Sequence, residues 1–315
     1  MSTEEQDKLQ QQRDRRKRIN RIKTGIIMTI SIWMLVSFVS IIVLCICLIK
    51  TNIKLNKFIN SGVNNEVSSE KPDVESEEIT SENIDDAYAN VITGIDTEDN
   101  MAVDGDTHYV YLTFDSEPGE NTDLILDALA AKGIKASFFV SGDDTEENQA
   151  VYQRIVNEGH TIGMNSYCNK YSTIYSSTDA FDSDYTQIHD YIYNLTGTDS
   201  KFYRFPGGSS NEISNVNMAE FVSILNQKNV TYFDWNVSAG DAANDYTVED
   251  IVKNVTEGVS KYKTSVVLLH DNSNKSTTAE AIGPLVDALQ NMQAEILPID
   301  ENTYVVQYIK AYSVE

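Results

Sequence analysis

Hydrophobic and polar positions divide the chain into stretches of different character. The first apolar stretch is 24–49, which carries no charged side chain. A helix needs about 20 predominantly apolar residues to cross a bilayer, whereas a cleavable signal has an apolar core of only about 7–15 residues. No small-residue cleavage motif follows residue 49. The pattern therefore predicts one transmembrane helix at 24–49, retained as a signal-anchor.

Basic residues on either side of this helix indicate its orientation. Residues 1–23 contain eight Lys or Arg side chains, and only Lys50, Lys54 and Lys57 follow the helix closely. An excess of positive charge stays on the cytoplasmic side of a membrane helix. We therefore expect 1–23 to be a cytoplasmic basic tail of a single-pass protein of the cell membrane, with its C-terminal domain extracellular.

The next stretch, 50–106, is acidic and polar. It is rich in Glu, Ser, Asp and Asn and poor in large apolar residues. A segment of this composition cannot bury enough apolar surface to offset the entropy lost on ordering. We therefore expect 50–106 to be a disordered extracellular stalk, with only a weak signal for a short element near Asn90–Ile95.

From residue 107 the pattern changes to short apolar runs that alternate with amphipathic segments. Runs rich in β-branched and aromatic residues mark seven candidate strands, at 108–114, 135–140, 160–165, 201–205, 232–237, 265–270 and 295–299. Apolar residues at helical spacing mark the segments between them. Strands that alternate with helices form parallel sheets. We therefore expect 107–315 to be one α/β domain, on either an open doubly wound sheet or a closed barrel.

Polar residues that could carry chemistry stand at the ends of five candidate strands. They are Asp115, Asn165 and Asn169, Arg204, Trp235 and Ser238, and His270. In β/α barrels the carboxyl ends of the strands carry the site. Each residue alone has an ordinary structural explanation, such as helix capping for an acid or core packing for a histidine. Their shared position favours a common site.

Composition narrows the classes of function. The chain has 24 Lys+Arg against 48 Asp+Glu, and its basic residues are concentrated in the tail. Binding to nucleic acid needs a basic surface, so we expect no nucleic-acid partner. Neither a G-x-G-x-x-G nor a G-x-x-x-x-G-K-[ST] motif occurs, so nucleotide binding has no support. Cys168 is the only cysteine after the apolar run, which excludes an intrachain disulfide in the domain.

Five sequence blocks resemble the polysaccharide deacetylases, the NodB-homology family also called carbohydrate esterase family four. The blocks are LTFDSEP (112–118), GHTIGMNSYCN (159–169), RFPGGSSN (204–211), FDWNVSAGDA (233–242) and VVLLHD (266–271), in the family's order. The resemblance covers about 107–305 and implies a distorted barrel of seven β/α units. It also implies hydrolysis of N-acetyl amides, in which a divalent metal, usually zinc, polarises the carbonyl and activates water.

The resemblance also implies catalytic roles, position by position. The family's general base falls at Asp115, the arginine that orients the base falls at Arg204, and the histidine that protonates the leaving amine falls at His270. The aspartate that tunes this histidine falls at Ser238. We therefore expect most of the acid/base frame to be retained and His270 to lack its carboxylate.

The implied metal site is different. The family's one Asp and two His ligands fall at Ser116, Asn165 and Asn169. Zinc prefers thiolate, imidazole or carboxylate, and hydroxyl and amide oxygens bind it weakly. We therefore expect no cofactor, with zinc or another divalent metal needed only if activity is retained. Glu117 is the nearest carboxylate that could rebuild a site, whereas His160 is expected at the opposite end of the barrel.

Aromatic rings near the strand ends are candidates for stacking on sugar. The candidate substrate-binding residues are Tyr167, Tyr171, Tyr175, Phe205, Pro206 and Trp235. Phe205 and Trp235 could equally belong to the core. Tyr171 and Tyr175, in the loop KYSTIYSS, are the better candidates for a stacking surface.

Three functions remain open. The favoured one is a pseudoenzyme that binds N-acetylated cell-wall glycan of the peptidoglycan type, or a protein partner, without turnover. The second is an active N-deacetylase that uses Asp115 as base and His270 as acid with a rebuilt or absent metal site. The third is a stalked surface scaffold or adhesin. Acetate release, glycan binding and recovery of a protein partner would distinguish them.

Overall fold

The computed structural model describes residues 98–103, 105–116, 118–143, 145–242, 246–311 and 314. The predicted basic tail, the apolar run at 24–49 and the stalk up to residue 97 lie outside these residues. None of the helices in the described part of the chain has the length and apolar character that a membrane span requires. Membrane anchoring therefore stays a prediction.

The described residues form short strands that alternate with helices, as the sequence pattern predicts. The strands are β1 (Tyr109–Ser116), β2 (Ser137–Val140), β3 (Thr161–Met164), β4 (Phe202–Tyr203), β5 (Thr231–Tyr232), β6 (Val237–Ser238), β7 (Thr264–His270) and β8 (Glu295–Ile296). The helices are the 3₁₀ turn η1 (Glu98–Asn100), α3 (Glu120–Lys132), α4 (Glu146–Asn157), α5 (Tyr171–Ile174), α6 (Thr178–Thr196), α7 (Met218–Gln227), α8 (Val248–Val259) and α9 (Ser276–Asn291).

All strand pairs are parallel, in the order β5-β4-β3-β2-β1-β7-β6. β1 lies at the centre of the sheet. It pairs with β7 along one edge, and along the other edge it pairs first with β8 and then with β2. The curled sheet is an open version of the predicted barrel, because β5 and β6 end the order of paired strands.

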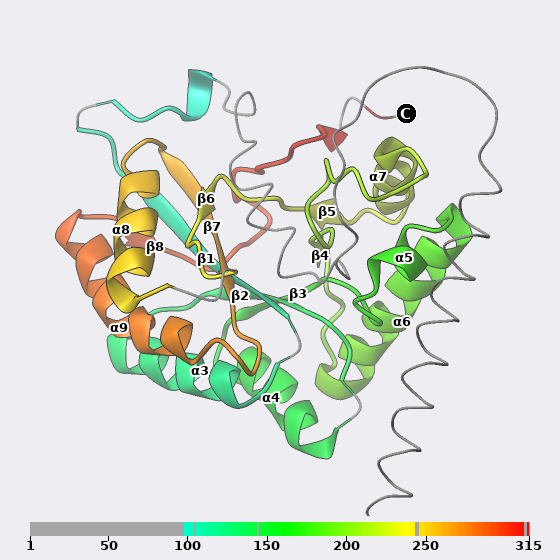
Figure 1. Ribbon diagram of the computed structural model, residues 1–315, viewed down its shortest axis with the longest axis horizontal. Helices are drawn as coiled ribbons and strands as arrows, with labels where there is room; N and C mark the ends of the chain where they lie inside the picture. Colours follow the sequence, from blue (N-terminus) through cyan, green and yellow to red (C-terminus); the bar gives the residue numbers. More distant parts are fainter. Residues whose placement is uncertain are drawn as a thin grey trace, which may run out of the picture. The chain divides into compact units, whose positions relative to one another are not determined.

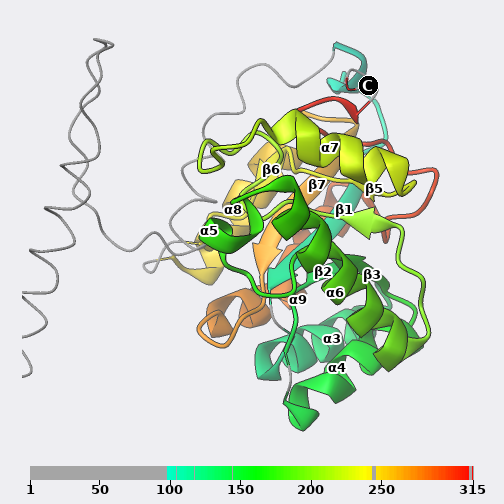
Figure 2. The ribbon, with the colours of Figure 1, turned by 90° about the vertical axis from the view of Figure 1, so that its right-hand side faces the viewer.

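The helices pack around the outside of the curled sheet. In Figure 1 they follow one another as α8, α9, α3, α4, α6 and α7, and neighbours in this series contact each other. The helices follow the same order as the strands, because each helix lies beside the strand that comes after it in the chain. Figure 2 shows α5, α6 and α7 on the near side of the sheet.

Alternate residues of the strands face opposite sides of the sheet, and both sides are apolar. Val110, Leu112 and Phe114 of β1 pack toward the helices in the larger core. A second cluster fills the inside of the curl, and it comprises Tyr111, Phe139, Phe233, Trp235, Val266, Leu268, Ile299 and Val306. The strands are therefore buried on both faces, as expected for a parallel sheet covered by helices.

The predicted fifth strand, 232–237, is in fact two strands. Its first part belongs to β5 at one edge of the sheet, and its last part belongs to β6 at the other edge. The backbone of 233–236 crosses between these edges, where the N–H of Phe233 bonds to β4 and the N–H of Asn236 bonds to β7. A continuous apolar run cannot reveal such a crossing, because both halves are buried.

Local sequence signals set several helix ends. Thr247 and Asp250 form a capping box at the start of α8. Gly133 ends α3 in the left-handed conformation (φ 67°), which glycine adopts at little cost.

Residues 98–103, predicted to belong to the stalk, instead pack on the domain. The amide side chain of Asn100 donates to the carbonyl of Thr264 and accepts from its N–H, both at 2.9 Å. Met101 forms an antiparallel bridge with Tyr262. The folded domain therefore begins before residue 107, at the amino ends of β1 and β7.

Candidate active site

Two titratable side chains stand on paired residues at the carboxyl end of the sheet. Asp115 is the penultimate residue of β1, and His270 is the last residue of β7. The register of the two strands pairs Asp115 with His270, and both residues are buried. The fold therefore brings together the two groups that the resemblance implies as base and acid.

Arg204 forms an ion pair with Asp115 and hydrogen bonds with groups inside the curled sheet. Its guanidinium donates to Oδ1 of Asp115 and to Oγ1 of Thr113, each at 2.7 Å. It also donates to the carbonyl oxygens of Phe233 at 3.0 Å and Asp234 at 3.4 Å. Arg204 is completely buried, so it is not a surface cation. Its charge is compensated by Asp115, and its donors are held in a fixed direction.

Asp241 holds His270 in place. Nδ1 of His270 lies 2.8 Å from Oδ1 of Asp241, and the His270 backbone N–H donates to Oδ2 at 2.8 Å. The hydroxyl of Thr278 donates to the same Oδ2. The expectation that His270 lacks its carboxylate, drawn from Ser238, is therefore wrong. Gly240 (φ 74°) turns the chain after β6, and Asp241 rather than Ser238 reaches the histidine.

The Asp241–His270 pair has the electrostatics of an acid/base group. Burial alone would raise the pKa of the Asp241 carboxyl, but the charge of His270 and the hydrogen bonds that Asp241 accepts outweigh it and hold the pKa below its ordinary value. A carboxylate on one ring nitrogen fixes the tautomer of an imidazole and stabilises its protonated form. The pair can therefore give or take a proton through Nε2 of His270.

The sequence analysis missed Asp241 and the residues around it. Lys275 is buried, and its Nζ donates to the carbonyls of Asp241 at 2.7 Å and Ala242 at 3.0 Å. Together with Thr278, it fixes the loop that carries Asp241. Nothing in the polar segment DNSNK distinguishes a buried lysine from an exposed one, whereas the acid in the block SAGDA was visible and could have been weighed against Ser238.

The positions that the resemblance assigns to metal ligands lie at the end of β1 and after β3. Ser116 ends β1, and its side chain and all of Glu117 lie outside the described residues. Asn165 is buried; its Oδ1 accepts from Oγ of Ser141 at 3.5 Å, and its Nδ2 donates to the carbonyl of Arg204 at 3.3 Å. The described residues contain no group of three His, Cys, Asp or Glu placed to hold a metal. A hydroxyl and amides do not fit a zinc site.

Asp184 of α6 shapes the loop after β3. Its two carboxylate oxygens accept the backbone N–H groups of Tyr167 and Cys168, each at 3.0 Å. The N–H of Asn169 donates to Oγ of Ser166, and Asn169 has a left-handed backbone (φ 46°). Asn adopts this conformation more readily than most residues. The loop therefore keeps a defined shape, with Cys168 as a partly buried packing residue.

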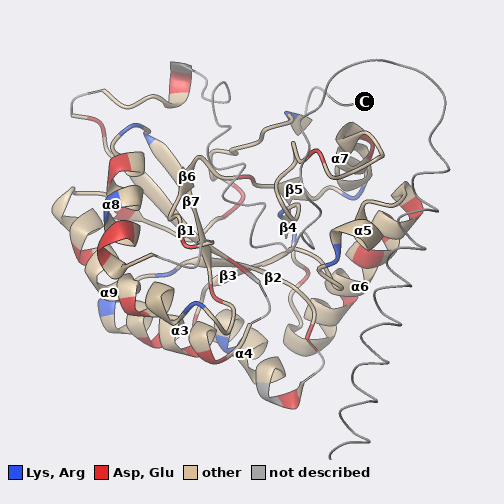
Figure 3. Ribbon diagram, viewed as in Figure 1, with Lys and Arg blue, Asp and Glu red and all other residues tan. Residues whose placement is uncertain are grey.

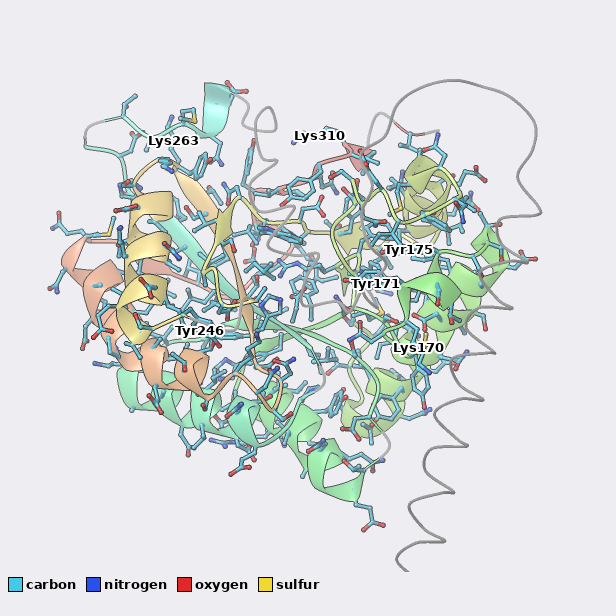
Figure 4. The ribbon with its side chains drawn as sticks, in the orientation of Figure 1. Lys170, Tyr171, Tyr175, Tyr246, Lys263 and Lys310 are labelled. Carbon is cyan, nitrogen blue, oxygen red and sulfur yellow. The ribbon has the colours of Figure 1, made fainter. Side chains whose placement is uncertain are left out.

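Most of the rings predicted to bind sugar are buried. Phe205, Pro206 and Trp235 belong to the interior, so the alternative of core packing is confirmed for Phe205 and Trp235. Tyr171 and Tyr175 are also buried, with stacked rings, and the Tyr175 hydroxyl donates to the carbonyl of Pro206 at 2.8 Å. Figure 4 labels both tyrosines, which stand at the start and the end of α5. Their prediction as an exposed stacking surface is wrong, because the short helix α5 turns both rings inward.

Tyr167 is the predicted sugar-binding ring that remains partly exposed. Its ring meets the ring of Tyr191 edge-on, with centroids 5.7 Å apart. It also packs on Gly142, where a Cβ atom would come within 2.7 Å of the ring. Tyr167 is thus held at the rim of the site by the loop after β2.

His160 lies at the other end of the sheet, as predicted. It precedes β3, and its Nδ1 accepts the backbone N–H of Ala136 at 3.1 Å. Its Nε2 has no hydrogen-bond partner within the described part of the chain. Burial and the positive charge of Lys135 lower the pKa of His160 to about 4, from an ordinary value of 6.5. The residue is a neutral core histidine and is remote from the site.

Acidification should destabilise the domain through His160. Between pH 6.5 and pH 4 the unfolded chain binds a proton that the folded chain excludes, so the free energy of unfolding should fall on the order of 2–3 kcal/mol as the pH decreases. Urea denaturation across this range measures the effect. In His160→Asn, whose amide oxygen can accept the Ala136 N–H, the loss should be smaller by that amount. An equal loss in both proteins would refute the assignment.

The helices around the sheet carry many acidic residues. Figure 3 shows Asp and Glu on the outward sides of the helices and few Lys or Arg. Several of the basic side chains are engaged locally, as where Arg154 bonds to Asp123, Asp127 and Glu158. The absence of a nucleic-acid partner stays a prediction from the sequence.

Comparisons with known proteins agree with this geometry. The family model described as polysaccharide deacetylase matches residues 102–233. The catalytic domain of a peptidoglycan N-acetylglucosamine deacetylase from Eubacterium rectale is 33% identical, with a TM-score of 0.62 over 67% of this chain and 96% of that domain. A carbohydrate esterase family four enzyme from Streptococcus mutans is 25% identical, with a TM-score of 0.56 over 62% of this chain and 87% of that chain.

A relative known by sequence extends the comparison. A peptidoglycan-N-acetylglucosamine deacetylase of Bacillus cereus is 30% identical over 186 residues, which are 58% of this chain and 61% of that enzyme. The chain thus spans less than two thirds of this relative.

Proposed function

Because the chain belongs to the polysaccharide deacetylase family, we propose that it binds N-acetylated cell-wall glycan of the peptidoglycan type with impaired metal-dependent chemistry. One observation carries this proposal. The positions of the family's metal ligands hold Ser116, Asn165 and Asn169, while Asp115 and His270 keep their places beside them. A site that keeps its acid/base residues but not its metal ligands is suited to binding a glycan more than to hydrolysing it.

The proposed loss of metal-dependent activity follows from the weak metal donors at the three ligand positions. Both atoms of the Asn165 amide already take part in hydrogen bonds, to Ser141 and to the carbonyl of Arg204. When bound in this family, the metal supplies several kcal/mol of stabilisation to the developing oxyanion. Each ~1.4 kcal/mol is a factor of ten in rate. Hydrolysis without this contribution would be slower by several powers of ten.

We propose that the domain acts outside the cell, held at the membrane by the helix predicted at 24–49. The support is the length of this apolar run and the excess of basic residues in 1–23. An extracellular position gives the domain access to cell-wall glycan. A protein partner at the same surface is a further expectation from the sequence.

A second candidate function is slow N-deacetylation. The observation that favours it is the intact Asp241–His270 pair, with Nδ1 2.8 Å from the carboxylate. In this case Asp115 would take a proton from water, and His270 would give a proton to the leaving amine. Glu117 could add a carboxylate beside them. Measuring acetate release together with glycan binding distinguishes the two candidate functions.

The test compares binding with turnover in the full chain, purified in detergent. We expect saturable binding to N-acetylglucosamine oligomers and to peptidoglycan, measured by calorimetry. We expect acetate release no greater than that of Asp115→Asn. Tyr167→Ala should weaken binding about three- to tenfold, because a stacked ring contributes about 0.5–1.5 kcal/mol beyond its buried area. Tyr193→Ala, an exposed tyrosine of α6, is the matched control.

Two results would overturn the proposal. Acetate release that is abolished by Asp115→Asn would establish the second candidate, and its loss with chelator would show a rebuilt metal site. No binding to either glycan by a chain with a cooperative unfolding transition would remove the glycan-binding role. A circular dichroism melt of each variant shows that the fold is intact.

A further inference from the structure

Lys275 is a buried lysine that neither candidate function uses. It is 1% exposed and stands just before α9. Its ammonium donates to the carbonyl oxygens of Asp241 at 2.7 Å and Ala242 at 3.0 Å, and it lies 5.5 Å from the centre of the Tyr246 ring. Lysine is rarely buried without a charged partner, because removing an ammonium from water is unfavourable. Its placement points to a role in what the ammonium holds.

The segment that this ammonium holds leaves the sheet just before Asp241. The N–H of Ala239, the residue after β6, still bonds to the carbonyl of Leu268 in β7. Gly240 then turns the chain with a left-handed backbone (φ 74°). Beyond this turn the carbonyls of Asp241 and Ala242 bond to Lys275 and not to a strand. Groups outside the sheet therefore hold this part of the backbone in place.

Two neighbouring helices, α8 and α9, supply these groups. Figure 1 shows the two helices side by side, and they contact each other. Asn254 of α8 packs on the turn, since a Cβ atom on Gly240 would come within 2.7 Å of its Nδ2. Thr278 of α9 donates to the Asp241 carboxylate at 2.8 Å. Thr278 thus fixes the side chain of Asp241, whereas Lys275 fixes the two peptide groups that follow its α-carbon.

The place of the Asp241 carboxylate decides which ring nitrogen of His270 carries the proton. Oδ1 of Asp241 lies 2.8 Å from Nδ1 of His270, and Oδ2 accepts the backbone N–H of His270, also at 2.8 Å. An ionised carboxylate only accepts hydrogen bonds, so Nδ1 carries the proton and Nε2 is left to exchange one. A displacement of the loop by about 1 Å would break both bonds, because their length range is narrow.

We propose that Lys275 is a positioning residue for His270, which keeps the Asp241 carboxylate on Nδ1 by holding the two carbonyls that follow it. The hydrogen bonds of its ammonium go to the loop and not to the imidazole. Lysine suits this role because one nitrogen with three N–H donors can serve two carbonyls at once. The inference does not depend on whether the site binds or hydrolyses glycan, since it concerns the geometry of the unbound chain.

Nitrogen NMR of the full chain, purified in detergent with labelled histidine, tests the proposal. The ring-nitrogen shifts of a neutral imidazole distinguish its two tautomers, and loss of one signal in His270→Asn assigns the residue. The parent chain should hold His270 in the Nδ1–H form. In Lys275→Met the ratio of the Nδ1–H to the Nε2–H form should fall about tenfold or more, because a hydrogen bond to a charged group is lost.

Amide hydrogen exchange in the same variant gives an independent reading with an internal control. In β7 the N–H of His270 donates to the Asp241 carboxylate, and the N–H of Val266 donates to the side chain of Asn236, each at 2.8 Å. Lys275→Met should speed exchange at His270 about tenfold or more and leave Val266 unchanged, because only the first acceptor lies on the loop that Lys275 holds.

A second lysine provides the matched control. The ammonium of Lys228 also lies over a tyrosine ring, 4.9 Å from the centre of Tyr185, and Lys228→Met should leave both readings at the parental values.

Two results would overturn the proposal. One is a folded Lys275→Met chain that keeps the parental tautomer ratio, as it would if the ammonium acted only as a nearby charge. The other is equal acceleration of the His270 and Val266 amides, which would show general loosening of the domain. If Lys275→Met does not fold, Lys275→Gln, which keeps a neutral donor, should move both readings in the same direction by a smaller factor, and unchanged readings there would equally contradict the proposal.

Discussion

Changing Ser116 to Asp and both Asn165 and Asn169 to His should give the chain a zinc site and zinc-dependent deacetylation. Ser116 ends β1, next to Asp115, and Asn165 and Asn169 follow β3 at the carboxyl end of the sheet. Imidazole and carboxylate are ligands that zinc prefers. The left-handed backbone at Asn169 suits the change, because His is among the few residues enriched in that conformation.

The expected gain is large because the metal contributes where charge develops. Several kcal/mol of oxyanion stabilisation correspond to about three powers of ten in rate or more. Acetate release from N-acetylglucosamine oligomers, with zinc and with chelator, measures the gain. Zinc affinity is measured separately by calorimetry, so that binding and catalysis are not confused.

Two comparisons test whether the replaced ligand positions alone account for the proposed impairment. Adding Asp241→Asn to the re-liganded chain should lower the rate without lowering zinc affinity, because Asp241 acts on His270. A re-liganded chain that binds zinc but releases no acetate would contradict the proposal that the ligands are what the site lacks. The defect would then lie in the groove that holds the glycan.

The places of Asp115 and His270 could be predicted from short sequence blocks. The carboxylate that holds His270 was assigned to the wrong position. Asp115 and His270 end buried strands, and strand ends are visible in the sequence as apolar runs that stop at a polar residue. The partner of His270 depends instead on the path of the chain after β6. The turn at Gly240 brings Asp241 to the histidine, and no periodicity in the sequence sets the direction of such a turn.

The prediction that Tyr171 and Tyr175 form an exposed stacking surface was wrong for a related reason. Tyr171 and Tyr175 lie in a polar segment that reads as a surface loop. A single turn of helix, α5, directs both rings inward, and Tyr175 packs against Phe221 of α7. The partners of these rings are far away in sequence, so only the tertiary structure reveals that they are buried. By contrast, Tyr167 is held at the rim by its near neighbours in the fold.

Removing the guanidinium of Arg204 should be the most destabilising single change in the site. In Arg204→Met the carboxylate of Asp115 loses its partner while it stays buried. The carbonyls of Phe233 and Asp234 and the ring of Phe139, 4.2 Å from the guanidinium carbon, lose their contacts as well. Breaking a buried ion pair costs about 3–5 kcal/mol, a large fraction of the stability of a typical domain.

Chemical denaturation measures this loss, and an exposed ion pair provides the control. Lys132→Met removes the surface contact to Asp287 and should cost less than about 1 kcal/mol. The double variant Arg204→Met/Asp115→Asn should recover part of the loss, because no uncompensated charge remains. Equal costs for Arg204→Met and Lys132→Met would refute the buried-pair explanation.

The outcome bears on why Arg204 stands beside family ligand positions that hold Ser116, Asn165 and Asn169. If its removal unfolds the domain, selection for stability alone retains Arg204 and, through it, Asp115. Asp241 fits the same explanation, because it joins β7, α9 and the loop after β6. The presence of Asp115, Arg204 and Asp241 would then be explained by the stability of the fold. Only measured acetate release would show turnover.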